Sequence, residues 1–239
     1  MAALAVLFVV CAPIHLLTRA ITGTSPWPRR FLGAAAWIVG ARVRVEGAPV
    51  ARHSLIIANH VSWLDILIVA GATGAAFVSK DSLGNGFVHW LADQNDTIYV
   101  RRGHMKGAKD QARDIAKALD GAKPVALFPE GTVGPGTELL PFRSTLLEAA
   151  NYAAGDVVVR PVAIDYGPAA TGIAWFGEPA MTNVRRVLGR RGTVPVMLRL
   201  LDPLAHGGGR KQLAAEARQA IEHALGFKSA EPSPIGLSQ

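Results

Sequence analysis

Short apolar runs alternate with helical segments along most of this 239-residue chain. A run such as Leu55-Ile56-Ile57-Ala58 is typical of a buried strand, and strands separated by helices favour a mainly parallel sheet. The predicted strands are residues 42–46, 54–58, 75–80, 97–101, 124–128, 157–164 and 193–200. The predicted helices are residues 2–20, 27–41, 83–92, 104–119, 145–154 and 213–225, with another after Leu64 and a disordered tail at 228–239. The pattern predicts an α/β fold, with a mainly parallel mixed sheet flanked by helices.

The N-terminal 41 residues combine apolar helices with positive charge alone. No acidic residue precedes Glu46, and the only charges before it are Arg19, Arg29, Arg30, Arg42 and Arg44. Arginines beside apolar helices favour the anionic cytoplasmic leaflet of a membrane. We expect a membrane-associating hairpin of two helices, 2–20 and 27–41, that dips into this leaflet and turns at Thr24-Ser25-Pro26. The alternatives are two core helices of a soluble protein, or a single span by a first run that is short for a full crossing.

Composition narrows the classes of partner and cofactor. Hydrophobic residues make up 50% of the chain, enough for one well-buried domain. Cys11 is the only cysteine and the seven histidines lack metal-ligand spacing, so we predict no disulfide framework, no metal and no cofactor. The net charge is +7, but the basic residues flank apolar helices and no nucleic-acid-binding motif accompanies them. We therefore predict no nucleic-acid partner.

Two boxes of chemically reactive residues stand where predicted strands end. They are Asn59-His60-Val61-Ser62-Trp63-Leu64-Asp65 and Phe128-Pro129-Glu130-Gly131-Thr132. A hydroxyl group becomes a good nucleophile only when a base removes its proton, and a histidine, with an ordinary pKa of about 6.5, suits that task. We predict that His60 is the base and that Asp65 fixes its tautomer. Ser62 has no separate base, so we expect a turn or cap hydroxyl there rather than a nucleophile.

The two boxes, in this order and about seventy residues apart, resemble the glycerolipid acyltransferase family, typified by 1-acyl-glycerol-3-phosphate acyltransferases. Weaker blocks at residues 97–102 and 159–162 extend the resemblance. The resemblance covers roughly residues 40 to 205, and we expect a domain over residues 42–227. It implies that this domain transfers an acyl chain from acyl-CoA or acyl carrier protein, and we expect direct transfer without an acyl-enzyme. The implied acceptor is the sn-2 hydroxyl of 1-acyl-glycerol-3-phosphate (lysophosphatidic acid), and the product is phosphatidic acid. Together with the arginine-rich hairpin, the resemblance places the reaction at the cytoplasmic face of the inner membrane.

Further site residues follow from the charge of such an acceptor and from the resemblance. Arg101 matches the family's phosphate-binding arginine, and the turn at Gly131 and Thr132 offers backbone N–H groups to an anion. Glu130 is expected to orient Arg101 or to hold the Gly131 turn, and the alternative is a structural salt bridge. Lys80 ends a predicted strand where the family often carries a lysine, and it is our candidate donor to the oxyanion. A solvated lysine is the alternative.

Other interpretations stay open. Val133-Gly134-Pro135 departs from the family pattern, which has arginine directly after the second box. Another lyso-lipid, such as lyso-ornithine lipid or a lysophospholipid, is therefore an alternative acceptor. A thioesterase would use His60 and Asp65 to activate water, and a non-catalytic membrane protein would need neither. A basic stripe on the predicted helix 104–119 would dock an acidic carrier protein or a membrane, or would be a solvated face; it comprises Lys106, Lys109, Arg113 and Lys117.

Overall fold

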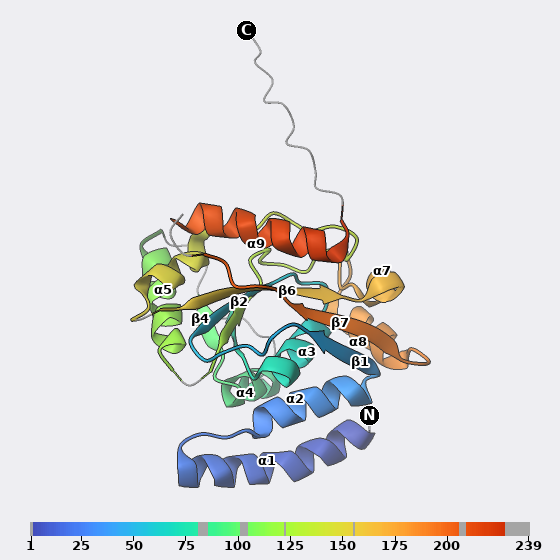
Figure 1. The fold of residues 1–239 in the computed structure, drawn as a ribbon. Helices are drawn as coiled ribbons and strands as arrows, with labels where there is room; N and C mark the ends of the chain where they lie inside the picture. The colour runs from blue at the N-terminus through green and yellow to red at the C-terminus, as the bar shows by residue number, and fades with distance from the viewer. Residues whose placement is uncertain are drawn as a thin grey trace.

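The computed structural model describes residues 2–80, 86–100, 105–121, 123–154, 156–205 and 209–227. A seven-stranded sheet lies at its centre (Figure 1). The strands are β1 (Ala41–Glu46), β2 (Ser54–Ala58), β3 (Ala76–Lys80), β4 (Ile98–Val100), β5 (Val125–Leu127), β6 (Val158–Asp165) and β7 (Val194–Leu200). Each predicted strand is present, and its ends lie within one residue of the predicted ends.

The sheet is mixed, with the strand order β1-β7-β6-β2-β5-β3-β4. The five strands from β6 to β4 are parallel, whereas β7 is antiparallel to β6 and β1 is parallel to β7. This confirms the predicted mainly parallel mixed sheet. In register, Ile57 of β2 pairs with Leu127 of β5, and Ala58 pairs with Val162 of β6. The residues that follow β2, β5 and β6 therefore meet at one edge of the sheet, the usual place for a site in α/β proteins.

Helices cover both faces of the sheet. Side chains of β2 alternate between the faces: Ile56 and Ala58 lie in one core cluster, and Leu55 and Ile57 lie in the other. Figure 1 shows α2 (Trp27–Ile38) and α3 (Leu64–Thr73) on one side of the sheet and α5 (Met105–Leu119) and α9 (Gly209–Leu225) on the other. The predicted helix 145–154 is a 3₁₀ turn, η1 (Thr145–Glu148), followed by α6 (Ala149–Tyr152).

The N-terminal segment forms two helices, α1 (Ala2–Thr22) and α2, joined by residues 23–26. α2 packs closely on α3 at a point where Gly33 and Gly71 meet. The contact requires glycine, because a Cβ on Gly71 would lie only 2.5 Å from the Cα of Gly33. The prediction that this helix reaches residue 41 is wrong. It ends at Ile38 because Gly40 adopts a φ of 104°, and Ala41 already belongs to β1.

α1 is the outermost helix in Figure 1, and its apolar side chains are largely exposed. It is long and apolar enough to cross a membrane by length and composition, with a mean hydropathy of 2.1, and 11% of its most apolar window is buried. Phe8 attaches it to the domain by edge contacts with Phe31 of α2 and with Phe87 and Trp90 of α4 (Gly86–Gln94). A helix with this composition and exposure suggests membrane association.

Further helical segments lie between β6 and β7, where the sequence pattern predicts none. They are η2 (Gly167–Ala169), α7 (Ala170–Ile173) and α8 (Ala180–Gly189). Asn183 of α8 is fully buried, and its amide nitrogen donates to the carbonyl oxygens of Ile173 and Ala174. Its Oδ1 accepts a hydrogen bond from the indole of Trp63 at 3.0 Å. This segment therefore supports the turn between β2 and α3.

Candidate active site

His60 and Asp65 lie close together at the turn from β2 into α3. Nδ1 of His60 is 2.8 Å from Oδ2 of Asp65. The backbone N–H groups of Val61 and Ser62 donate to the same oxygen at 2.6 and 2.8 Å. Asp65 is fully buried, so this carboxylate depends on protein donors rather than on water. It fixes the turn and the imidazole at the same time.

The imidazole of His60 has one defined orientation. Because Asp65 accepts the hydrogen bond from Nδ1, Nε2 of the neutral ring is the nitrogen with a free lone pair. Phe128 stacks on the imidazole with a centroid distance of 4.0 Å and an interplanar angle of 10°, and Phe77 stacks on Phe128. The His60 side chain is 16% exposed, and within the described residues Nε2 has no hydrogen-bond partner. General-base chemistry requires such an accessible nitrogen.

Glu130, which follows β5, connects His60 to the loop after the second box. Its Oε1 accepts a hydrogen bond from the backbone N–H of His60 at 2.7 Å, and its Oε2 accepts one from the N–H of Leu140 at 2.9 Å. The side chain is almost completely buried. Burial raises the pKa of Glu130 to about 7, although both hydrogen bonds favour the charged form. Glu130 is thus a tether for the backbone of His60, a contact that the sequence pattern does not predict.

Two other polar residues of the first box hold the backbone. The amide of Asn59 pairs with the backbone of Ile164, donating to its carbonyl oxygen at 3.0 Å and accepting from its N–H at 2.8 Å. This pair joins the end of β2 to β6. Ser62 is fully buried, and its hydroxyl accepts a hydrogen bond from the N–H of Leu64, an arrangement that fits the expected turn or cap hydroxyl.

A cavity of about 210 Å³ opens beside this turn. Its lining includes Asn59, His60, Glu130, Glu138, Asp165 and Tyr166, and the end of α9 forms another part of the wall. Gly136 belongs to the lining as well, and Gly134, two residues before it, donates its N–H to the carbonyl oxygen of His60 at 2.6 Å. Among the described lining residues there are three carboxylates and no lysine or arginine.

The structure does not test the roles predicted for the other site residues. Gly131 adopts a φ of 70°, which explains the glycine, and Thr132 is exposed, but neither residue lines the cavity. Lys80 is the last residue of β3, and its side chain lies outside the described part of the structure. Arg101 also lies outside the described residues. The roles predicted for these four residues therefore stay predictions.

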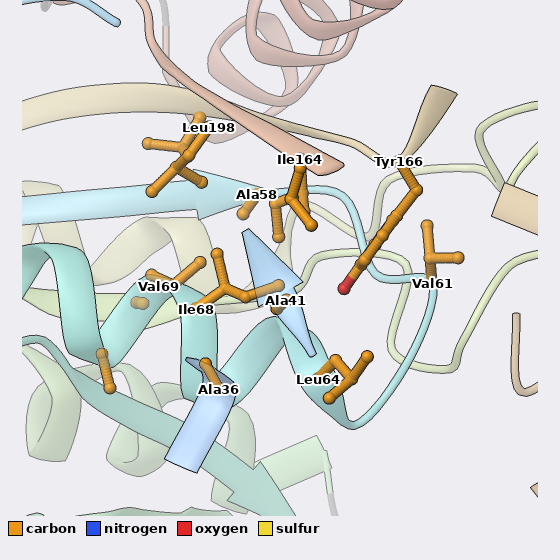
Figure 2. Close-up of a cluster of buried hydrophobic side chains, with 14 of the residues drawn as sticks. Ala36, Ala41, Ala58, Val61, Leu64, Ile68, Val69, Ile164, Tyr166 and Leu198 are labelled. Atoms are coloured by element: carbon orange, nitrogen blue, oxygen red, sulfur yellow. The ribbon is translucent and has the colours of Figure 1, made fainter. Parts of the chain in front are cut away.

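Tyr166, one residue after β6, was not among the predicted site residues. Its hydroxyl donates to Oδ1 of Asp65 at 2.5 Å. Figure 2 shows Tyr166 within the buried cluster, with its oxygen directed toward the turn between Val61 and Leu64. The available signal in the sequence is its position two residues after the predicted buried strand 157–164. In the described part of the chain, no group of three or more His, Cys, Asp or Glu side chains is arranged to hold a metal ion.

Comparison with a solved structure agrees with this architecture. The crystal structure of the 1-acyl-sn-glycerophosphate (LPA) acyltransferase PlsC from Thermotoga maritima superposes with a TM-score of 0.61. The match covers 94% of each chain at 21% sequence identity, so it concerns the fold alone. It confirms the predicted α/β architecture.

Sequence comparisons define the class of enzyme. Residues 42–165 match the Acyltransferase family. A lyso-ornithine lipid O-acyltransferase from Rhodobacter capsulatus is 30% identical over 95% of this chain and 89% of that protein. A 1-acyl-sn-glycerol-3-phosphate acyltransferase from Neisseria gonorrhoeae is 31% identical over 55% of this chain and 51% of that protein. The chain belongs to the acyltransferase family and is an enzyme of that class.

Proposed function

We propose that the protein transfers an acyl chain from a thioester donor, acyl-CoA or acyl carrier protein, to the hydroxyl of a lyso-lipid. The hydrogen bond of His60 Nδ1 to Asp65, which leaves Nε2 open, carries this proposal. Nε2 takes the proton of the acceptor hydroxyl as its oxygen attacks the thioester carbonyl. The tetrahedral intermediate then collapses, the C–S bond breaks, and the imidazolium returns the proton to the leaving thiolate. Asp65 stabilises the imidazolium between these steps.

Direct transfer fits the groups around His60 better than an acyl-enzyme. The hydroxyl of Ser62 is buried and is engaged with the backbone of α3. Cys11 is a buried residue of α1, a helix that packs outside α2. Neither side chain lies at the open nitrogen of His60, so the acceptor hydroxyl itself is the nucleophile.

For the acceptor, we propose a lyso-ornithine lipid. Relatives with that name align over most of this chain, as in the 30% identity over 95% of it. The cavity supports the same choice because an ornithine head group carries an ammonium besides its carboxylate, whereas a phosphate has no positive group to pair with the carboxylates of the lining. Asp165 is paired with Arg199 at 2.8 Å, but Glu138 is exposed and has no ion-pair partner within the described residues. Glu138 is therefore available to an ammonium.

The second candidate acceptor is 1-acyl-glycerol-3-phosphate. The Neisseria gonorrhoeae relative has that substrate in its name, and the predicted phosphate contact at Arg101 would serve it. In this case Gly131 and Thr132 would offer backbone N–H groups, as the sequence predicts. The product would be phosphatidic acid for phospholipid synthesis.

We also propose that the enzyme works at the cytoplasmic face of the inner membrane. The exposed apolar residues of α1 support this, since each would gain from burial in lipid; the largest exposures are those of Val6, Val9, Leu17 and Ile21. Arg29 and Arg30 stand at the start of α2, and no acidic residue occurs in either helix. Soluble thioester donors would approach from the cytoplasm while the lyso-lipid stays in the leaflet.

An acceptor panel tests this proposal. The purified protein is incubated with radiolabelled acyl-CoA or acyl carrier protein and with lyso-ornithine lipid, 1-acyl-glycerol-3-phosphate or no acceptor. Labelled ornithine lipid as the main product is the expected result. Transfer to 1-acyl-glycerol-3-phosphate alone would replace the first acceptor by the second. Labelled free fatty acid at the same rate without any acceptor would identify a thioesterase and contradict the proposal.

A further inference from the structure

The hydroxyl of Tyr166 has a single described partner, the carboxylate of Asp65. Tyr166 is 2% exposed, and its ring packs with apolar neighbours such as Val61 and Ile164. A phenylalanine would fill the same volume, so packing accounts for the ring but not for the hydroxyl. A buried hydroxyl without a partner is costly, and here the partner is Oδ1 of Asp65 at 2.5 Å.

The contact completes a chain of hydrogen bonds that ends at the open nitrogen of His60. Tyr166 donates to Oδ1 of Asp65, while Nδ1 of His60 donates to Oδ2. Oδ2 also accepts from the N–H groups of Val61 and Ser62, whereas Tyr166 is the described donor to Oδ1 and fixes the other end of the carboxylate. Because a hydrogen-bonded carboxylate attracts an imidazolium less strongly, loss of the Tyr166 hydroxyl would strengthen the attraction between Asp65 and a protonated His60. The buried phenol remains a donor, because burial and then the nearby Asp65 raise the pKa of Tyr166 well above its ordinary value.

We propose that Tyr166 is a positioning residue for acyl transfer, because its hydroxyl orients Asp65 and thereby sets the orientation and basicity of His60. This inference rests on the proposed function. Few other charged groups face this chain within the described residues. Glu130 accepts from the backbone of His60 and, with Glu138, lines the cavity. Two further carboxylates are neutralised, because Asp165 pairs with Arg199 and Glu178 pairs with Arg186.

The variant Tyr166→Phe removes only the hydroxyl. We expect kcat to fall roughly tenfold while KM for donor and acceptor stays within about twofold, because the loss affects the reacting groups rather than the binding of substrates. The acidic limb of kcat/KM should move up by roughly 0.5 to 1 pH unit, because Asp65 then holds the imidazolium more strongly. Tyr152→Phe is the matched control, since Tyr152 is an exposed residue of α6 that does not line the cavity, and it should change neither quantity.

A purely structural role for Tyr166 would lower the fraction of folded enzyme and leave the pH profile of the remainder unchanged. That result, or wild-type kcat in Tyr166→Phe, would overturn the proposal. If the variant does not fold, 3-fluorotyrosine replaces tyrosine in the wild-type chain. The more acidic phenol donates a stronger hydrogen bond, so the acidic limb should move down, and an unmoved limb would be the contrary result.

Titration of His60 by NMR separates this inference from the proposed function because it needs no substrate. The His60 resonance is assigned by its loss in His60→Gln. A higher pKa of His60 in Tyr166→Phe than in the wild type supports the role of Tyr166 even if no acceptor is acylated. An equal pKa in the two proteins would contradict it even if wild-type transfer is rapid.

Discussion

The substitution Glu130→Gln tests whether ionisation of the buried Glu130 side chain, which accepts a hydrogen bond from the backbone N–H of His60, destabilises the folded protein. The carboxylate is 3% exposed, and burial is the main reason that its pKa rises from the ordinary 4.5 to about 7. The folded protein therefore keeps the proton to a higher pH than the unfolded chain. Both states hold it below about pH 4.5, so Glu130 costs no stability there, and the cost grows as the pH rises to about 7. This difference in pKa corresponds to about 3 kcal/mol in the free energy of unfolding, most of it between pH 5 and 7.

Glutamine keeps the shape of the side chain but cannot ionise. Its amide oxygen can accept from one of the two N–H groups, of His60 or of Leu140, while its amide nitrogen faces the other. That mismatch costs about 1–3 kcal/mol at every pH. The variant should therefore be less stable than the wild type at pH 5 and should lose this disadvantage, or become the more stable protein, by pH 8.

Denaturant unfolding in detergent at several pH values between 5 and 8 measures this crossover. The quantity of interest is the difference in unfolding free energy between Glu130→Gln and the wild type, because the other titrating groups cancel in it. Glu216→Gln is the control, since the hydrogen bond of this α9 carboxylate to Gln212 is exposed and is its only one among the described residues, and its difference should not vary with pH. A constant difference for Glu130→Gln over this range would refute the reasoning.

Two further substitutions test the packing of α2 and the choice of acceptor. Alanine at Gly71 should lower the free energy of unfolding by about 1–3 kcal/mol, because its Cβ would lie 2.5 Å from the Cα of Gly33. Alanine at Gly86 is the control and should cost nothing comparable, because a Cβ there would meet no other part of the described structure within 4 Å. Equal thermal midpoints for the two variants would contradict this account of the α2–α3 contact. Glu138→Arg should shift the kcat/KM ratio toward 1-acyl-glycerol-3-phosphate over lyso-ornithine lipid by roughly threefold to tenfold, and an unchanged ratio would remove Glu138 from head-group selection.

The sheet could be predicted from sequence because its signals are local. Each strand is a short apolar run, and the alternation with helices favours parallel pairing. The segment between β6 and β7 has no such signal. Its helices are short and are interrupted by glycine and proline, and Asn183 is buried for its hydrogen bonds rather than for its hydrophobicity. The premature end of α2 likewise depends on the positive φ of Gly40.

The contacts of the site are likewise of two kinds: some join residues close in sequence, and others join residues far apart in sequence. The pair His60 and Asp65 could be predicted because five residues separate them at a strand-to-helix junction. Tyr166 is 101 residues from Asp65 and Glu130 is 70 residues from His60, so these contacts exist only because β2 lies between β6 and β5. The order of strands in a sheet is a property of the whole fold, and the pattern of apolar runs does not contain it.

The role of His60 is the central claim, and the rate of acyl transfer in His60→Gln tests it most directly. Glutamine approximates the size of the ring but cannot act as a base at Nε2. Wild type and variant are compared with radiolabelled acyl-CoA and both lyso-lipid acceptors, after circular dichroism shows that both proteins are folded. We predict that the variant loses transfer by about 1,000-fold or more to whichever lyso-lipid the wild type acylates. Transfer by the variant within about tenfold of the wild-type rate would contradict the assignment of His60 as the base.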